Sequence, residues 1–417
     1  KTVSTYCYQC VAGPDLLTVR IEDGAATEVA PNFKAATIHP AGGKACVKAF
    51  GLIQKAYTPH RILHPMKRTN PKKGRNEDPG FVRISWDEAL DLVAAKLKEA
   101  RANGLLDESG YPRVAASFGG GGTPTAYMGT LPAFLAAWGP VDFSFGSGQG
   151  VKCTHSEHLY GELWHRAFTV APDTPLCEYL VSFGANTEAS GGVCGVKRHA
   201  DARKRGMKRV QVEPHLSITG ACSAEWIPIK PKTDVAFMYA MINVALHEAP
   251  RSKLDISFLK AHTSSPYLVG PNGFFLRDPQ SRKPLIWDAK TGRAVAFDTG
   301  DADPALEGDF TVSGVEVGPD NEVAAHNMAA AQPAFARLLA HMAPYTPEWA
   351  SAVCGVEAKT IRRIANEYLD HARVGETIEI EGQVLPFRPV AVALGETVNN
   401  GWGGYECCWA RTLLACI

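Results

Sequence analysis

Apolar and polar residues along the middle of the chain form segments typical of strands and helices. The segments 113–118, 176–183 and 226–230 are short and mainly apolar, and 208–213 alternates polar residues with two valines, so all four predict strands of a sheet. The segments 193–205, 234–247 and 358–371 carry apolar residues at helical spacing. Strands that alternate with helices predict a mainly parallel, doubly wound α/β sheet, whose ligands bind beyond the carboxyl ends of its strands.

Two further segments add to this outline. Ser85-Trp-Asp-Glu88 has the pattern of a capping box, and apolar residues at helical spacing follow it as far as Gly104. We therefore expect a helix that starts at Ser85. Residues 263–325 are rich in Gly, Pro and Asp, which predicts loops with short hairpins inserted into the α/β pattern.

Composition excludes some classes of protein. Lys plus Arg and Asp plus Glu each total 43, so the net charge is zero and a nucleic-acid partner is not expected. The cysteines number 11, an odd count at irregular spacings, which favours reduced thiols with a metal site and a cytoplasmic location over a disulfide scaffold. No apolar run reaches the ~20 residues that span a bilayer. Because the sequence ends on an apolar segment, we expect a truncated chain.

The cysteines nearest the N-terminus have the spacing of metal ligands. Cys7-Tyr-Gln-Cys10 is a Cys-x-x-Cys motif, and Cys46 lies further along the chain. Thiolates at this spacing can occupy two corners of one metal centre. Zinc, a redox dithiol and an iron–sulfur cluster all fit this motif, and so do two buried, inert cysteines.

The order of the motifs that follow resembles the start of one enzyme family. After Cys46 come Lys48, Pro65-Met-Lys-Arg68 and Ile84-Ser-Trp-Asp-Glu-Ala-Leu90. This ordered set is similar to the DMSO-reductase-like family of molybdopterin oxidoreductases. The resemblance implies that the cysteines hold a 4Fe–4S cluster and that Lys48 lies between the cluster and a pterin.

One position departs from the family pattern. A third cysteine is expected near Pro14, and the sequence there is Cys10-Val-Ala-Gly-Pro-Asp15. Asp15 could supply an oxygen ligand in place of the missing thiolate. The alternatives are a cluster with an open iron, or no cluster.

The resemblance extends to the ends of the predicted strands. Phe183-Gly-Ala-Asn-Thr187, Val212-Glu-Pro-His-Leu-Ser217 and Lys230-Pro-Lys-Thr-Asp-Val-Ala236 match family motifs, with departures at the Glu, His and Lys positions. We expect cofactor contacts from Gly119, Gly120, Gly184, Asn186, Glu213, Thr233 and Asp234.

Each of these roles has a chemical reason. Backbone amides at Gly184 can approach a diphosphate, Glu213 can accept ribose hydroxyls, and Asp234 can accept N–H donors of a guanine edge. The alternative is an NAD-binding domain. Gly119-Gly-Gly-Gly-Thr-Pro124 argues against it, because this segment lacks the G-x-G-x-x-G spacing.

A metal-side loop is expected at Gly148-Gln-Gly-Val-Lys-Cys-Thr-His-Ser-Glu-His158. The resemblance implies a protein ligand to the metal near this point, with Cys153 preferred over Ser156 because a soft thiolate suits a metal already bound by dithiolene sulfurs. His155, Glu157 and His158 are candidate acid–base groups. A zinc site and solvated loop polarity are the alternatives for these three residues.

The resemblance also implies a domain plan. We expect an iron–sulfur domain at 1–70, a discontinuous pterin-binding α/β domain at 71–150 and 330–417, and a Rossmann-like domain at 151–330 that binds the pterin nucleotide and carries the insert at 263–325. These α/β domains interleave as in other family members. We expect this chain to lack the C-terminal β-barrel domain of the family.

The implied function is two-electron redox chemistry at a molybdenum or tungsten centre with bis-molybdopterin guanine dinucleotide. The insert and the Cys10–Asp15 segment resemble phenylacetyl-CoA:acceptor oxidoreductases, which implies oxidation of a CoA thioester at its α-carbon. A polysulfide, thiosulfate or arsenic oxyanion reductase, a non-redox hydratase or transhydroxylase, and a metal-free structural subunit remain alternatives. The expected partners are an iron–sulfur electron-transfer subunit and a membrane-anchor subunit, through which a cytoplasmic chain would associate with a membrane.

Overall fold

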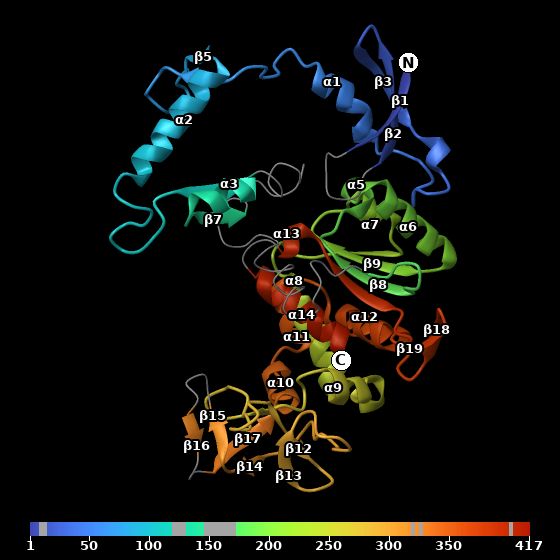
Figure 1. The fold of residues 1–417 in the computed structure, drawn as a ribbon. Coiled ribbons are helices and arrows are strands. Elements are labelled where there is room, and N and C mark those ends of the chain that lie inside the picture. Colours follow the sequence, from blue (N-terminus) through green and yellow to red (C-terminus); the bar gives the residue numbers. More distant parts are fainter. Residues whose placement is uncertain (8–14, 119–130, 146–171, 318–321, 325–327, 400–402) are drawn as a thin grey trace. The chain divides into compact units, whose positions relative to one another are not determined.

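The computed structural model describes residues 1–7, 15–118, 131–145, 172–317, 322–324, 328–399 and 403–417. Two compact units make up the chain. Unit 1 comprises residues 1–150 and 190–197, and unit 2 comprises residues 151–189 and 198–417. Figure 1 labels their helices and strands.

Unit 1 begins with a three-stranded antiparallel sheet in the order β1-β2-β3. Leu17 and Val29 of this sheet form a small core with Ala49, and Cys7 packs against it. The elements of unit 1 up to residue 150 are β1 (Thr2–Tyr6), β2 (Leu16–Glu22), β3 (Ala25–Pro31), η1 (Phe33–Ala35), η2 (Val47–Gly51), α1 (Leu52–Ala56), β4 (Met66–Arg68), β5 (Phe81–Arg83), α2 (Trp86–Arg101), β6 (Ala115–Phe118), α3 (Leu131–Trp138) and β7 (Asp142–Phe145).

Helix α2 starts where the sequence predicts. The Ser85 hydroxyl accepts a hydrogen bond of 3.0 Å from the backbone N–H of Glu88, which confirms the cap. In a capping box the Glu88 side chain would accept from the backbone N–H of Ser85. In the structure the Glu88 carboxylate instead lies 3.2 Å from the Lys67 ammonium and forms an ion pair with it.

Unit 2 is built on a four-stranded sheet in the order β10-β9-β8-β20, with all neighbouring strands parallel. The strands are β8 (Tyr179–Phe183), β9 (Lys208–Glu213), β10 (Glu225–Pro228) and β20 (Val390–Leu394). The chain moves from β8 to β9 and β10 on one side, and β20 returns much later to pair with the other side of β8. The strand order therefore reverses between β8 and β20.

Helices pack against both faces of this sheet (Figure 1). Val181, Phe183, Val210 and Val212 point to the large core that Phe237 of α8 shares with the neighbouring helices. Among the helices that contribute to this core are α8 (Asp234–Asn243), α11 (Pro347–Cys354), α12 (Ala358–His371) and α14 (Gly404–Cys416).

The opposite face meets a second group of helices. Leu180 of β8 packs against Ala202 of α6 and Met207. The helices on this side are α5 (Thr187–Ser190), α6 (Gly192–Arg205) and α7 (Ile218–Cys222). On β9 this face is polar, because Arg209, Gln211 and Glu213 alternate with the two valines of the large core.

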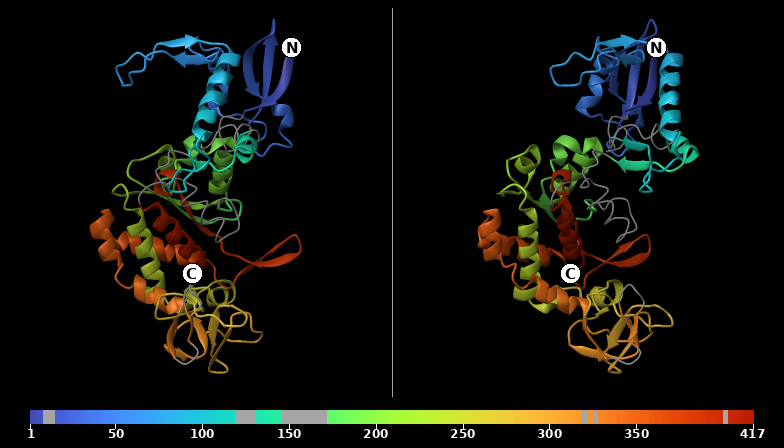
Figure 2. Two further views of the ribbon diagram at one scale, coloured as in Figure 1. Left: turned by 60° about the vertical axis from the view of Figure 1, so that its left-hand side comes forward. Right: turned by 90° about the vertical axis from the view of Figure 1, so that its left-hand side faces the viewer.

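The short strands of residues 268–333 form a separate small core within unit 2. Leu268, Leu276, Leu285 and Val312 are among its buried members, and the Trp287 and Phe310 rings next to them stack 4.3 Å apart. The hairpins of this region agree with the predicted loop-rich insert and are gathered together in Figure 2. Its strands are β11 (Leu268–Val269), β12 (Leu285–Asp288), β13 (Arg293–Ala296), β14 (Phe310–Val312), β15 (Val315–Val317), β16 (Glu322–Ala324) and β17 (Ala329–Pro333).

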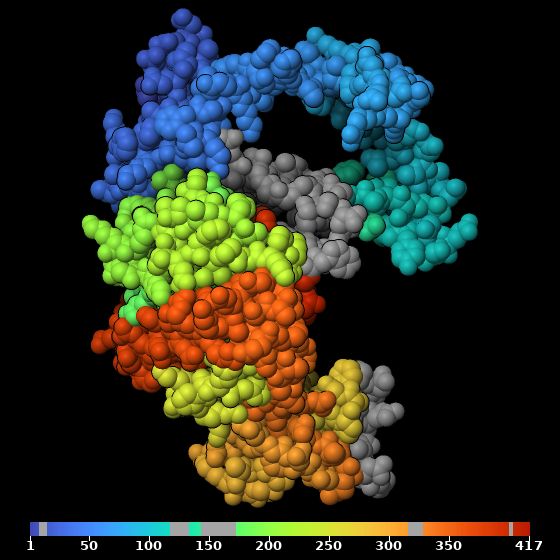
Figure 3. Space-filling view, turned by 180° about the vertical axis from the view of Figure 1, so that it is seen from behind, coloured from blue at the N-terminus to red at the C-terminus, as the bar shows by residue number. Residues whose placement is uncertain are grey.

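Polar contacts join segments of unit 2 that are distant in sequence. Arg363 of α12 pairs with Glu225 of β10 at 2.5 Å, and the backbone N–H of Lys230 donates to the carbonyl of Cys354 at 3.0 Å. In the space-filling view of Figure 3, the green and the orange parts of unit 2 meet along one surface. The remaining elements are η6 (Val244–Glu248), η7 (Arg251–Lys253), α9 (Ile256–His262), α10 (Ala334–Met342), β18 (Thr377–Ile380), β19 (Gln383–Pro386) and α13 (Glu396–Asn399).

The mixed α/β fold class is thus confirmed, while the domain boundaries stay a prediction. The sequence groups 330–417 with 71–150, whereas β20 of the structure pairs with β8 in the sheet of unit 2. Within the described ranges, none of the helices is both long enough and apolar enough to cross a bilayer.

Candidate functional site: the carboxyl edge of the unit 2 sheet

The carboxyl ends of β8 and β20 meet at the point where the strand order reverses. In open α/β sheets this switch point is where ligands bind. Gly184 directly follows β8 and Gly395 directly follows β20, and the Gly395 N–H donates to the Phe183 carbonyl at 2.8 Å. The two turns therefore lie against each other.

Both glycines at this switch point are required by close packing. A Cβ on Gly395 would lie 2.4 Å from the Gly184 carbonyl oxygen, and one on Gly184 would lie 2.7 Å from a Val398 methyl group. Gly184 also has a φ of 61°, a left-handed conformation that favours glycine. The missing side chains thus let the two turns pack directly against each other at the switch point.

Asn186 extends from the same turn and is half-buried. Its Oδ1 lies 3.1 Å from the Thr219 hydroxyl and 3.4 Å from the Thr219 backbone nitrogen. The turn after β8 is therefore joined to α7, which follows β9.

Glu213 lies at the end of β9 but points into the protein. Only 3% of it is exposed, and its two carboxylate oxygens accept hydrogen bonds from the Ser217 N–H at 2.7 Å and the Gln211 side chain at 2.9 Å. A Cβ on Gly220 would lie 2.5 Å from this carboxylate. Glu213 holds the turn after β9 in shape, and its role toward a ribose stays a prediction.

Thr233 and Asp234 lie at the start of α8, where backbone N–H groups are unpaired by the helix itself. Thr233 donates to the Lys230 carbonyl at 2.7 Å. Asp234 is buried, and this burial raises the pKa of its carboxyl above the usual range, although Lys232 opposes the shift. A buried carboxyl group at a helix start is consistent with a ligand that brings N–H donors.

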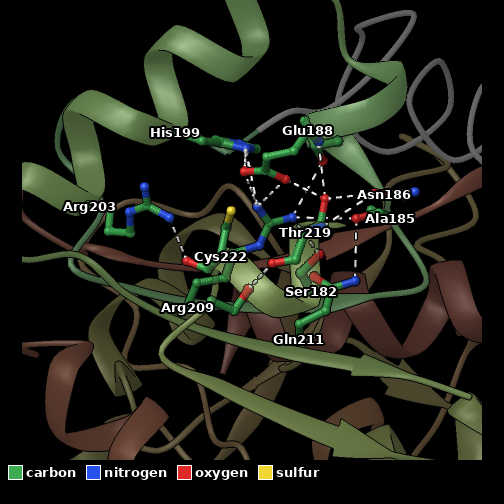
Figure 4. A network of polar contacts seen from close by, with 12 residues as sticks. Ser182, Ala185, Asn186, Glu188, His199, Arg203, Arg209, Gln211, Thr219 and Cys222 are labelled. Carbon is green, nitrogen blue, oxygen red and sulfur yellow. Dashed lines mark hydrogen bonds and ion pairs between the residues drawn. The ribbon is translucent and has the colours of Figure 1, made fainter. Parts of the chain in front are cut away.

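Beneath the Asn186 turn lies a buried ionic cluster, which we call the Arg209 cluster: Ser182, Asn186, Glu188, His199, Arg209 and Thr219 (Figure 4). Arg209 Nη1 lies 3.1 and 3.2 Å from the two Glu188 oxygens, and only 6% and 13% of the two side chains are exposed. Arg209 Nη2 donates to the Ser182 hydroxyl at 3.3 Å. His199 Nδ1 lies 3.2 Å from Arg209 Nη1.

The Glu188 carboxylate keeps its charge to low pH. Burial raises its pKa, but hydrogen bonds from His199 and Thr219 and the charge of Arg209 outweigh burial and lower the pKa to about 2 from the ordinary 4.5. Ionised Glu188 is thus the form that balances the buried guanidinium.

This shift predicts how Glu188→Gln changes acid stability. Because the folded-state pKa is depressed, the charge of Glu188 stabilises the protein above pH 4.5, and this contribution is lost as the pH falls toward about 2. We expect the free energy of unfolding of the wild type to exceed that of Glu188→Gln by up to about 3 kcal/mol near neutral pH. Urea unfolding followed by tryptophan fluorescence at several pH values measures the difference, and a gap that widens below pH 4 would contradict the assigned ion pair.

The N-terminal cysteines and Asp15 lie in unit 1. The Cys7 N–H donates to the Asp15 carbonyl at 2.8 Å, and the Cys46 N–H donates to Asp15 Oδ2 at 2.5 Å. Asp15 is 6% exposed, while Cys7 and Cys46 are half-buried. In the part of the chain that the structure describes, no group of three or more His, Cys, Asp and Glu side chains has the arrangement of a metal site.

The structure does not describe several of the predicted site residues. Cys10, Gly119, Gly120, Cys153, His155, Ser156, Glu157 and His158 lie outside the described residues. Lys48 lies in η2 and is exposed. The cluster, metal-ligand and acid–base roles of these residues stay predictions.

Some residues of the site were not found from the sequence. Lys232 adopts a left-handed backbone with a φ of 64°, and its ammonium donates to the Thr397 carbonyl at 2.7 Å, next to the Gly184 turn. Arg209 and Thr219 were also missed. For Arg209 a signal existed, because regular alternation of charged and apolar residues is unusual in a parallel strand that is buried on both faces.

The fold is that of a mixed α/β protein in which Gly184, Asn186 and Asp234, three of the predicted cofactor residues, lie at the carboxyl edge of one sheet. A profile of the molybdopterin oxidoreductase family matches residues 61–415. The chain belongs to this family, which confirms the family inferred from its motifs. The family implies a molybdopterin cofactor with molybdenum.

Individual relatives agree with this membership. A sulfite dehydrogenase chain from Allochromatium vinosum is 27% identical over 87% of this chain and 36% of its own length. The molybdopterin-containing subunit of the arsenate respiratory reductase of a Shewanella species is 26% identical over 93% of this chain and 38% of its own length. The chain thus spans less than two fifths of either relative.

A solved structure supports the fold. Acetylene hydratase from Pelobacter acetylenicus superposes with a TM-score of 0.62 over 99% of this chain and 43% of its own, at 16% sequence identity. At this identity the likeness concerns the fold alone.

Proposed function

We propose that the chain is the cofactor-binding part of the catalytic subunit of a molybdenum or tungsten oxidoreductase carrying bis-molybdopterin guanine dinucleotide. The observation that carries this proposal is the close Gly184–Gly395 contact between two strand-end turns, at the switch point of a parallel sheet. When bound, the metal and its pterins supply two-electron redox chemistry.

The residues at this edge fit part of such a cofactor. Gly184 gives the turn its tight left-handed backbone, Asn186 offers a polar side chain, and Asp234 offers a buried carboxyl group for N–H donors. Glu213 fits less well, since its oxygens already accept hydrogen bonds inside the protein. We therefore assign ligand contact to the turns after β8 and β20 and to the start of α8.

In unit 1, we propose that Cys7, Cys10 and Cys46 hold a 4Fe–4S cluster through which electrons leave the metal. The Asp15 hydrogen bonds to the backbone of Cys7 and Cys46 support this proposal, because they bring two of the cysteines to one place. Asp15 then lies beside the cluster, as its fourth ligand or as the group that orients Cys46. The expected recipient of the electrons is a separate iron–sulfur subunit, itself held by a membrane anchor.

Cofactor analysis of the full-length protein tests the proposal. We expect about two guanine nucleotides and two pterins for each molybdenum or tungsten atom, with about four irons in the N-terminal region. Metals are counted by mass spectrometry, and oxidised pterin is measured by its fluorescence. Protein that binds neither pterin nor metal after expression in a host that makes the cofactor would make the chain a metal-free structural subunit.

For the substrate, we favour an oxyanion or a sulfur species. Relatives across most of this chain are named for sulfite and arsenate, which agrees with the sulfur or arsenic oxyanion alternative. Neither of these names refers to a thioester, so oxidation of phenylacetyl-CoA stays a prediction that the two relatives do not support. A non-redox hydratase remains the second alternative.

Dye-linked assays separate these substrates. We expect electron transfer between an artificial dye and sulfite, thiosulfate or arsenate, and none with phenylacetyl-CoA. Dye reduction by phenylacetyl-CoA, with labelled oxygen from water in the product, would instead establish oxidation at the α-carbon. Addition of water to a substrate, with no oxidation or reduction of the dye, would favour a hydratase.

A further inference from the structure

The Arg209 cluster links two turns that the sheet alone does not connect. Asn186 and Glu188 follow β8, whereas Thr219 belongs to α7 after β9. Thr219 lies between Glu188 and Asn186 in Figure 4, and its hydroxyl contacts both side chains. The Glu188 N–H also donates to this hydroxyl at 3.1 Å. Thr219 is fully buried, so these contacts are shielded from water.

The donors and acceptors determine how Asn186 is oriented. A backbone N–H can only donate, so the Thr219 nitrogen, 3.4 Å away, requires that the Asn186 oxygen rather than its amide nitrogen face it. The Thr219 hydroxyl has one hydrogen, which the Glu188 carboxylate and the Asn186 oxygen share as acceptors. With its oxygen held inward, Asn186 directs its N–H₂ group away from Thr219.

Charge keeps this arrangement in place. Ionised Glu188 is a stronger acceptor for the Thr219 hydroxyl than a neutral group would be, and Arg209 holds that charge through two contacts at 3.1 and 3.2 Å. Arg209 is itself anchored on β9 and reaches the Ser182 hydroxyl of β8 at 3.3 Å. The chain of contacts thus runs from the strands through Arg209, Glu188 and Thr219 to Asn186.

We propose that Arg209, Glu188 and Thr219 are positioning residues that preset the Asn186 amide N–H₂ to donate to an oxygen of the pterin nucleotide, on its diphosphate or ribose. This inference rests on the proposed function of the same edge. None of the three residues touches the ligand; they act through Asn186.

The test uses full-length, cofactor-loaded enzyme and the rate at which it releases its cofactor. Thr219→Val keeps the branched shape and removes the hydroxyl, while Thr219→Ser keeps the hydroxyl. Released cofactor is measured in the filtrate as oxidised pterin fluorescence. We expect release about tenfold faster in Thr219→Val, a change of ~1.4 kcal/mol, and within about twofold of wild type in Thr219→Ser.

A double-mutant cycle separates positioning from general destabilisation. Asn186→Ala should speed release by itself, and Thr219→Val should add no further effect in that background, although it should still lower the melting temperature. Equal acceleration by Thr219→Val with and without Asn186 would overturn the inference, as would release at the wild-type rate in Thr219→Val. Should Thr219→Val fail to fold, Thr219→Ala, which also removes the hydroxyl, takes its place in the cycle with the same expectations.

Different results would contradict the proposed function and the positioning role of Thr219. Wild-type enzyme that carries no pterin nucleotide would overturn the proposed function, and this inference with it. Wild-type enzyme that carries the nucleotide but shows no coupling between Thr219 and Asn186 would overturn the inference alone.

Discussion

We expect the Cys153→Ala variant to keep its pterin and to lose turnover by at least about 10³-fold, which corresponds to ~4 kcal/mol of activation free energy. Cys153 follows β7 in a segment that resembles the metal-side loop of the family, and a thiolate is the soft ligand that suits this metal. Pterin content should not change, because the nucleotide contacts proposed above lie in unit 2 turns far along the sequence. X-ray absorption should detect one sulfur fewer at the metal.

Two matched variants make this expectation specific. Cys416→Ala removes a half-buried cysteine of α14 and should leave both the metal spectrum and turnover unchanged. Ser156→Ala should also leave the metal spectrum unchanged. A normal spectrum in Cys153→Ala together with an altered one in Ser156→Ala would move the protein ligand to Ser156.

The second large effect concerns iron. Cys46→Ala should lower the iron content from about four atoms per chain to less than one and remove the electron paramagnetic resonance signal of the reduced cluster, because one thiolate ligand is lost. Reoxidation of the substrate-reduced metal should then stop. Cys416→Ala again serves as the control for a cysteine without a predicted ligand role.

Asp15→Asn distinguishes the two possible roles of Asp15. The asparagine oxygen can still accept the Cys46 N–H that Asp15 Oδ2 accepts at 2.5 Å, but a neutral amide is a poor iron ligand. Because that carboxylate oxygen is already hydrogen-bonded, we expect the iron content to be retained. A three-iron cluster in Asp15→Asn would identify Asp15 as the fourth ligand, and iron-free wild type would contradict the cluster itself.

Local sequence patterns predicted the central elements well. The strand at 208–213 and the helix at 358–371 have the bounds expected from the spacing of their apolar residues, because those residues lie on a face that is buried in the structure. The helix expected over 234–247 begins at Asp234, but its last turn is the π-helical η6. Periodicity alone does not distinguish these two kinds of turn.

The pairing of β20 with β8 lay beyond sequence reasoning. Val390-Ala-Val-Ala-Leu394 is a short apolar run that fits many positions in a sheet. Its place beside β8 depends on tertiary contacts, including the Gly184–Gly395 approach. The switch point that defines the candidate site therefore became visible only in the structure.

Sequence motifs located several side chains of the site, but they did not predict how every one of them is oriented. Motifs brought attention to Gly184, Asn186 and Asp234, and all three lie at the carboxyl edge of one sheet. The motif at Glu213 gave no indication that its carboxylate would turn inward to the Ser217 N–H. The orientation of such a side chain depends on burial and on competing hydrogen bonds within the folded chain. The spacing of residues along a sequence does not reveal either of these.

Hydrogen exchange tests the central claim most directly, by comparing cofactor-loaded and cofactor-free full-length enzyme. If the pterin nucleotide binds at the carboxyl edge of the unit 2 sheet, amides of residues 184–188, 230–234 and 395–399 should exchange more slowly in the loaded enzyme. Amides of the small β core at 268–317 serve as the internal reference and should not change. Equal exchange at the sheet edge in both forms, with protection elsewhere in the chain, would contradict the assignment of this edge as the cofactor site.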